Sequence, residues 1–134
     1  MNREEMLGLL GRNKKAVMTT IGRDGTPHSV PVLYALDADV VLISGTQGRA
    51  RTNNLRRDPR CVVTVFDDGD WFKWVTVQGT VQLRTEDAVA ENARLYTMIT
   101  GKPPENMDEY REAMIREKRL VYALSIERWY PSGD

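Results

Sequence analysis

The sequence predicts a mainly β protein, an antiparallel barrel of six strands with short helices at its periphery. Short apolar or alternating runs recur along the chain, and most of the turns between them contain glycine or aspartate. Turns this short join antiparallel strands, whereas parallel strands need long crossover connections. A longer helical stretch occurs only before the last strand. At 134 residues, 41% of them hydrophobic, the chain is expected to form one domain over residues 1–134, with a small core.

Two of the expected strands carry residues with a structural meaning of their own. Pro31, in the second strand, has no N–H for a sheet ladder, which indicates either an edge strand or a backbone left open to a flat ligand. The fifth strand is too long to lie flat, and Gly79 is the expected place for a bend or bulge. The strands are expected at residues 16–21, 27–36, 40–44, 61–66, 71–84 and 120–128.

The expected helices begin at recognisable capping residues. Asn2, with Glu5 three residues later, has the spacing of a capping box, and the helix that it begins should cover one end of the barrel. Thr85, followed by two acids, is the expected N-cap of a later helix. The helices are expected at residues 3–10 and 50–57, from Thr85 to Gly101, and from Asn106 onward.

Composition and charge exclude several classes of protein. The formal net charge is zero, with 19 basic and 19 acidic side chains, whereas a general nucleic-acid binder carries a basic excess. Cys61 and His28 are the only cysteine and histidine, so neither a disulfide framework nor a metal site is expected. No apolar run approaches the roughly 20 residues of a membrane span, and the N-terminus has no signal-peptide pattern. We therefore expect a cytoplasmic protein.

The stretch from Ser44 to Arg60 is predicted to bind an anion. A Gly-Thr-Gln-Gly turn follows a strand and leads into a short helix rich in arginine. Backbone N–H groups and the helix dipole attract an anion at a helix start, and guanidinium groups hold it. A solvated basic helix is the alternative, but the cluster lies at a strand end beside small residues, where a ligand can approach. The arginines are Arg49, Arg51, Arg56, Arg57 and Arg60.

Three segments together resemble the pyridoxamine 5'-phosphate oxidase-like superfamily of flavin-binding split β-barrels, in particular its small actinobacterial members that use the deazaflavin coenzyme F420. Residues 19–32 resemble the family's first hairpin, residues 49–60 its phosphate-binding segment, and residues 75–81 its long bent strand. The resemblance covers nearly the whole chain and depends on the order and spacing of all three. It implies a six-stranded split β-barrel that forms a homodimer, with a cofactor in each of two clefts at the subunit interface.

The resemblance also implies a set of cofactor-binding residues. The tricyclic ring would lie against Val30 and Pro31, and Trp74 of the second subunit would close the cleft. Many relatives carry lysine at the position of Arg51, and arginine can also hold a phosphate, through two hydrogen bonds. The ring edge and ribityl chain would be bound by Ser44, Gly45, Thr46 and Gln47, and the phosphate by Arg49, Ala50 and Arg51, with Asn54 nearby.

The function implied by the resemblance is hydride transfer from reduced F420 to a small conjugated organic substrate. FMN is the alternative cofactor on the same fold, and a non-catalytic protein that binds flavin, deazaflavin or haem is a third possibility. F420 carries an acidic oligoglutamate tail, so the surplus Arg56, Arg57 and Arg60 favour the tailed cofactor, although helix solubility explains them nearly as well.

No catalytic side chain is predicted. The sequence shows no Ser-His-Asp set and no obvious pair of carboxylates. His28 is either a proton donor to the substrate or a structural residue. An aromatic group either lines a pocket for a flat substrate or packs in the core and the dimer; it comprises Trp71, Phe72, Trp74, Trp129 and Tyr130.

Overall fold

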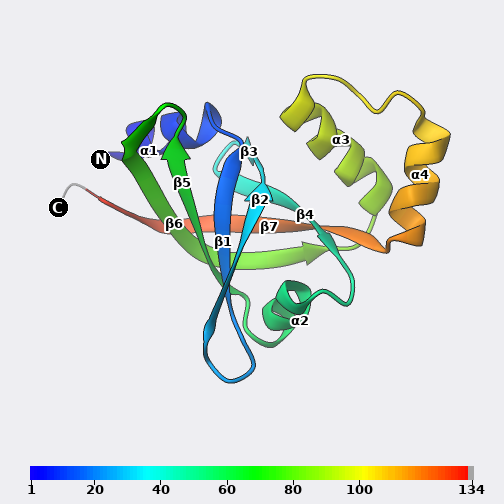
Figure 1. Cartoon of the computed structure of the whole chain (residues 1–134), viewed down its shortest axis with the longest axis horizontal. Helices are drawn as coiled ribbons and strands as arrows, with labels where there is room; N and C mark the ends of the chain where they lie inside the picture. The colour runs from blue at the N-terminus through cyan, green and yellow to red at the C-terminus, as the bar shows by residue number, and fades with distance from the viewer. Residues whose placement is uncertain (133–134) are drawn as a thin grey trace.

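A computed structural model describes residues 1–132, and in this part of the chain seven antiparallel strands form one curled sheet with four helices around it (Figure 1). The strands are β1 Lys15–Ile21, β2 Pro27–Leu33, β3 Ala35–Asp37, β4 Val40–Thr46, β5 Arg60–Asp67, β6 Asp70–Arg84 and β7 Arg119–Tyr130. The helices are α1 Arg3–Gly11, α2 Ala50–Arg57, α3 Ala88–Thr100 and α4 Met107–Arg116. The predicted mainly β, antiparallel architecture is confirmed.

The order of the strands shows why the sheet must curl. It runs β2-β1-β5-β6-β7-β4-β3, with β2 and β3 at opposite ends. Only Tyr34 separates these two strands along the chain. Because consecutive Cα atoms are about 3.8 Å apart, the two edges of the sheet have to meet at this residue. Figure 1 shows β1 and β2 lying across β6 and β7, as a curled sheet requires.

Tyr34 is also the reason that the predicted strand over residues 27–36 is wrong as a single element. Its side chain is fully buried, and its hydroxyl donates a hydrogen bond to the carbonyl of Leu10 at 2.7 Å. Its backbone N–H donates to the carbonyl of Lys14 at 2.9 Å. The chain therefore leaves β1 at this point and continues as β3 against β4, which raises the strand count from six to seven.

The remaining local predictions mostly agree with the structure. The capping box of Asn2 and Glu5 is present, and α1 buries three side chains in the core, as expected for a helix that covers one end of the barrel. The pairing of β6 with β7 shifts register between Gln78 and Gly79. A Cβ atom on Gly79 would overlap the carbonyl of Ser125, so the bulge requires glycine there.

The start of α3 differs from the prediction. The helix begins at Ala88, and its N-cap is Asp87 in the left-handed region, at a φ of 52°, with no side-chain capping bond. Thr85 instead lies in the connection between β6, which ends at Arg84 as expected, and the start of α3. The following helix does begin at Asn106, whose side chain accepts from the Glu109 N–H at 3.1 Å.

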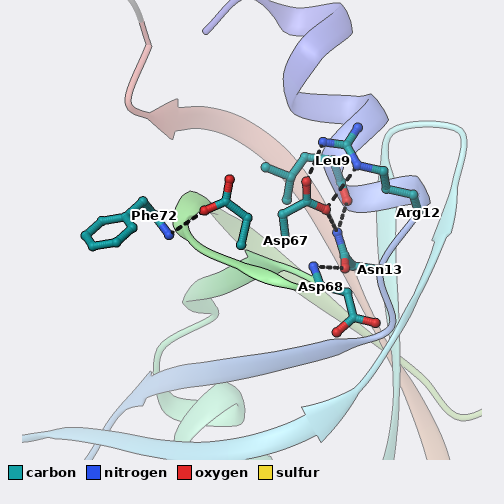
Figure 2. A network of polar contacts seen from close by, with 7 residues as sticks. Leu9, Arg12, Asn13, Asp67, Asp68 and Phe72 are labelled. Carbon is teal, nitrogen blue, oxygen red and sulfur yellow. Dashed lines mark hydrogen bonds and ion pairs between the residues drawn. The ribbon is translucent and has the colours of Figure 1, made fainter.

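Figure 2 shows how the end of α1 is tied to the turn between β5 and β6. Two guanidinium nitrogens of Arg12 donate to the two carboxylate oxygens of Asp67, at 3.0 and 2.9 Å. The buried Asn13 amide donates to Asp67 and to the Leu9 carbonyl, both at 2.8 Å, and accepts from the Asp68 N–H. These bonds lower the pKa of Asp67 to about 2, chiefly through Arg12.

Among residues 1–132, no helix is both long enough and apolar enough to cross a bilayer.

Candidate functional site

The predicted anion-binding corner lies where β4 passes into α2. Strand β4 continues two residues further than expected, to Thr46, and the turn consists of Gln47 and Gly48, the latter at a φ of 83°. Helix α2 has Arg49 as its N-cap, and no side chain caps it. The N–H groups of the first turn and the positive end of the helix dipole are therefore left for an anion.

Helix α2 is held in place by a buried hydroxyl pair that the sequence did not indicate. Thr52 donates to the carbonyl of Thr46 at 2.7 Å and forms a second hydrogen bond with the hydroxyl of Tyr122 on β7. A Cβ atom at position 45 would overlap the Tyr122 ring. Gly45 is therefore required for the Tyr122 ring to reach Thr52. Through this contact Tyr122 fixes the position of α2, and with it the position of the anion-binding corner.

The five predicted arginines fall into two groups. Arg56 donates to Gln47 and to Asn53, Arg57 donates to Asn54 at 2.6 Å, and Arg60 pairs with Asp58 at 2.7 Å. These three side chains already have local partners. Arg49 is exposed at the helix start, whereas Arg51 is half-buried and its Nε is buried without a hydrogen-bond partner in the described residues.

A pocket of about 420 Å³ lies against this corner, between strands β2 and β4 on one side and helices α3 and α4 on the other; we call it the α3–α4 pocket. Three predicted residues from separate elements meet on its walls: Pro31, Ser44 and Arg51. The other lining residues are Val32, Leu33, Ile43, Asn92, Leu95, Tyr96, Ile99, Tyr110, Met114 and Arg119.

The other predicted binding residues lie outside this lining. Val30 packs against the core from β2, and Asn54 is buried, with its amide donating to Thr20 at 3.1 Å. Trp74 lies on β6 beside Tyr130, with ring centroids 5.8 Å apart. The remaining predicted residues belong to the end of β4 and the start of α2: Gly45, Thr46, Gln47, Arg49 and Ala50.

Asn92 is a functional candidate that the sequence did not indicate. It is buried on α3, where its amide nitrogen donates to the Ala88 carbonyl at 2.8 Å. Its oxygen accepts the hydroxyl proton of Ser44 at 2.5 Å. The hydroxyl of Ser44 therefore has only lone pairs left for a ligand and acts as an acceptor. The sequence signal that could have indicated Asn92 is its position as a polar residue on the apolar face of the predicted helix.

Arg119, at the start of β7, was also missed. It stands opposite Thr46 in the β4–β7 ladder and donates to Glu117 at 2.9 Å. Its Nε, like that of Arg51, is buried without a hydrogen-bond partner in the described residues. The pocket lining contains two arginines and no acidic residue, so its walls are positively charged.

The remaining titratable and aromatic candidates lie elsewhere. Burial raises the pKa of the Cys61 thiol to about 12, which makes it a poor nucleophile. His28 is half-buried opposite Thr20, its Nδ1 has no hydrogen-bond partner within the described part of the chain, and it does not line the pocket. Trp71 stacks on Phe66 at 4.4 Å, and the Trp129 indole donates to the Met1 carbonyl at 3.0 Å. No group of three potential metal-ligating side chains occurs in residues 1–132.

Known proteins resemble this chain over nearly its whole length. A biliverdin reductase of Mycobacterium tuberculosis that depends on reduced coenzyme F420 is 24% identical over an alignment of 134 positions, which covers 98% of this chain and 88% of the relative. A crystal structure of a conserved hypothetical protein from the same species has a TM-score of 0.79 at 23% identity, covering 96% of this chain and 82% of that one.

A solved F420 reductase has a TM-score of 0.73 at 21% identity, covering 91% of this chain and 93% of that one. At these identities the likeness to solved structures concerns the fold. The family model described as pyridoxamine 5'-phosphate oxidase matches residues 3–133. With that match across nearly the whole chain, and with a curled antiparallel sheet of the split-barrel type, the protein belongs to the pyridoxamine 5'-phosphate oxidase family.

Proposed function

We propose that this protein is an oxidoreductase that binds coenzyme F420 and reduces a small conjugated organic substrate. One observation carries the proposal: Arg51, whose Nε is buried without a hydrogen-bond partner in the described residues, lines a ligand-sized pocket beside a helix start that no described side chain caps. A buried donor without a partner is costly, and a ligand phosphate would satisfy it. The relatives named for F420 support this cofactor over others that also carry a phosphate.

In the proposed complex, different residues contact the phosphate, the tricyclic ring and the ribityl chain of the cofactor. Arg49, Arg51 and the N–H groups from Ala50 onward hold the phosphate. Pro31, on the edge strand beside Val30, offers backbone and ring atoms to a flat tricycle. Ser44 accepts a hydrogen bond from a ring N–H because its own proton is donated to Asn92. The remaining contacts come from Gly45, Thr46 and Gln47 along the ribityl chain.

Bound F420 supplies the hydride, and the protein supplies the position of the two reactants. The reacting carbons have to approach to about 3–3.5 Å, and the apolar wall of the pocket excludes water from that contact. The described lining residues include no histidine, acid or cysteine, and in this proposal solvent supplies the proton that completes the reduction.

A homodimer is part of the proposal. Several aromatic residues are exposed on one chain, among them Trp71 at 70%, Phe72 at 89% and Tyr130 at 66%. Side chains of this size are usually covered when they gather at one edge of a protein. In the dimer, Trp74 and its neighbours on β6 close the cofactor cleft of the second copy, and Asn54 acts indirectly by fixing α2 to β1.

Titration with cofactor tests the proposal directly. We expect F420 to bind tightly, measured by the change in its fluorescence, and more tightly than FMN. The reduced cofactor should then be oxidised in the presence of at least one member of a panel of quinones, enones, tetrapyrroles and nitroaromatics. Tight binding of FMN with no binding of F420 would contradict the choice of cofactor. Binding of F420 without turnover across the panel would favour a carrier protein.

A further inference from the structure

Arg119 is a second cation of the α3–α4 pocket for which the proposed phosphate site has no use. Its side chain is 25% exposed, and its Nε is buried without a partner in the described residues. One of its terminal nitrogens donates to Glu117 at 2.9 Å, and Glu117 itself does not line the pocket. The guanidinium is therefore only partly engaged within the described residues, and Arg119 lines the pocket.

The positive charge of the α3–α4 pocket favours the binding of an anion in addition to the cofactor phosphate. Arg51 and Arg119 both line it, each with a buried Nε that has no hydrogen-bond partner among residues 1–132, and the described lining contains no acid. An incompletely paired guanidinium in a partly buried site is costly, and a carboxylate that accepts two parallel N–H bonds is the usual remedy. Two separate arginines can serve two separate anionic groups.

The opposite wall of the pocket is apolar and aromatic. Leu95 and Ile99 come from α3 and Met114 from α4. Tyr96 and Tyr110 also line it, in an edge-to-face contact with ring centroids 5.8 Å apart. Walls of this kind bind flat, apolar molecules, and about 420 Å³ is within the range of small-molecule sites.

We propose that Arg119 binds the carboxylate of the electron acceptor, and that the acceptor is a flat, conjugated carboxylic acid whose apolar body lies against α3 and α4. This inference rests on the proposed function and assigns a substrate class to it. The cofactor is the other source of an anion, because Arg119 stands opposite Thr46 near the start of α2. A hydrated oligoglutamate tail would gain little from this apolar wall, and the uncapped helix with Arg49 and Arg51 already suffices for a phosphate.

The test compares an acid with its neutral ester. Binding of para-nitrobenzoate and its methyl ester is measured by calorimetry on the protein without cofactor, and again with oxidised F420. We expect the acid to bind about tenfold more tightly than the ester, the factor that one charged hydrogen bond provides. Arg119→Gln should abolish this preference, and Arg111→Gln, an exposed arginine on α4, should preserve it.

A third variant distinguishes ligand binding from a structural role of Arg119. Glu117→Gln removes the acid that competes for the guanidinium, so the preference for the acid should increase about two- to threefold over wild type. A structural ion pair predicts no such gain. The proposal is overturned if wild type binds neither compound or binds both equally, or if the preference survives in Arg119→Gln.

Measuring the affinity of the variants for F420 identifies whether the anion bound by Arg119 belongs to the substrate or to the cofactor. Arg119→Gln should leave the affinity for F420 within about twofold of wild type. A loss of about tenfold, with the acid preference unchanged, would assign the anion to the cofactor and overturn the proposal. Failure of wild type to bind F420 would contradict the proposed function alone, because the acid–ester comparison is also made without cofactor.

Discussion

Six arginines bear on the site, and the position of each in the sequence says little about whether its side chain is available to a ligand. Arg56, Arg57 and Arg60 are the closest together in the sequence, yet each already donates to a side chain two or three residues away along the chain. The partnership between Arg60 and Asp58 is strong enough to lower the pKa of that aspartate to about 2. Within residues 1–132, Arg51 and Arg119 are the two arginines whose Nε is buried without a hydrogen-bond partner.

Replacing Arg51 with alanine should weaken F420 binding by about 1.5–3 kcal/mol, the usual scale for a hydrogen bond to a charged group. The affinity is measured by fluorescence titration. Arg23→Ala removes the same charge from the exposed β1–β2 turn and should have little effect. An unchanged affinity in Arg51→Ala would mean that the phosphate binds elsewhere.

Gly45 is required because the ring of Tyr122 on β7 occupies the space that a side chain at position 45 would need. Gly45→Ala would drive a methyl group into the Tyr122 ring, and overpacking of this kind costs about 1–3 kcal/mol. Urea unfolding should show a loss of that size. Because Tyr122 holds Thr52, the affinity for F420 should fall as well. Stability and affinity equal to wild type would show that the ring moves aside freely.

At the scale of elements, the helical stretch from α3 to α4 serves as a wall of the candidate site. Helix α3 packs on β7 and on α4, and it places Asn92 against Ser44. The sequence indicated two helices here and nothing more. Their contribution to the pocket depends on the loop that folds α4 back beside the start of β7 (Figure 1).

The contact between α1 and the β5–β6 turn should make stability depend on pH. Arg12 and Asn13 lower the pKa of Asp67 from its ordinary 3.8 to about 2 in the folded protein. The ionised carboxylate therefore stabilises the fold above the unfolded-state pKa, and this contribution is lost as the pH falls toward 2. Asp67→Asn should lower the free energy of unfolding at neutral pH and flatten its decline between about pH 5 and pH 2.

The matched control for this variant is Asp68→Asn. The side chain of Asp68 takes no part in the network of Figure 2, although its backbone N–H does. Chemical denaturation at a series of pH values gives the free energy of unfolding of Asp67→Asn, Asp68→Asn and wild type, and Asp68→Asn should follow the wild-type pH profile. Equal pH profiles for Asp67→Asn and wild type would show that the ion pair contributes nothing to stability.

For the whole molecule, curling brings the two edges of the sheet together at Tyr34 but leaves aromatic residues of the β5–β6 hairpin uncovered. If they form the dimer, sedimentation should give twice the mass of one chain. The double variant Trp71→Ser, Phe72→Ser should give the mass of one chain and bind F420 more weakly. Ile115→Ser, at another exposed apolar position, is the control. A monomeric wild type would contradict the dimer.

Local features of this protein could be read from short stretches of sequence. The capping residues Asn2 and Asn106, the bulge at Gly79 and the limits of α2 all depend on groups a few residues apart or on one backbone position. The antiparallel architecture followed from short turns. The arginine-rich helix start directly follows a strand in the sequence, so the position of the anion-binding corner could also be predicted from neighbouring residues.

Features that depend on distant contacts could not be read in this way. The break at Tyr34 arises where two edges of one sheet meet, and the pairing of Ser44 with Asn92 spans 48 positions. Which arginine keeps a free nitrogen depends on every acceptor that folding brings near it, and Arg119 reaches the pocket because β7 pairs with β4. Short-range patterns specify the local elements, whereas burial and strand pairing across the curled sheet determine which polar atoms remain for a ligand.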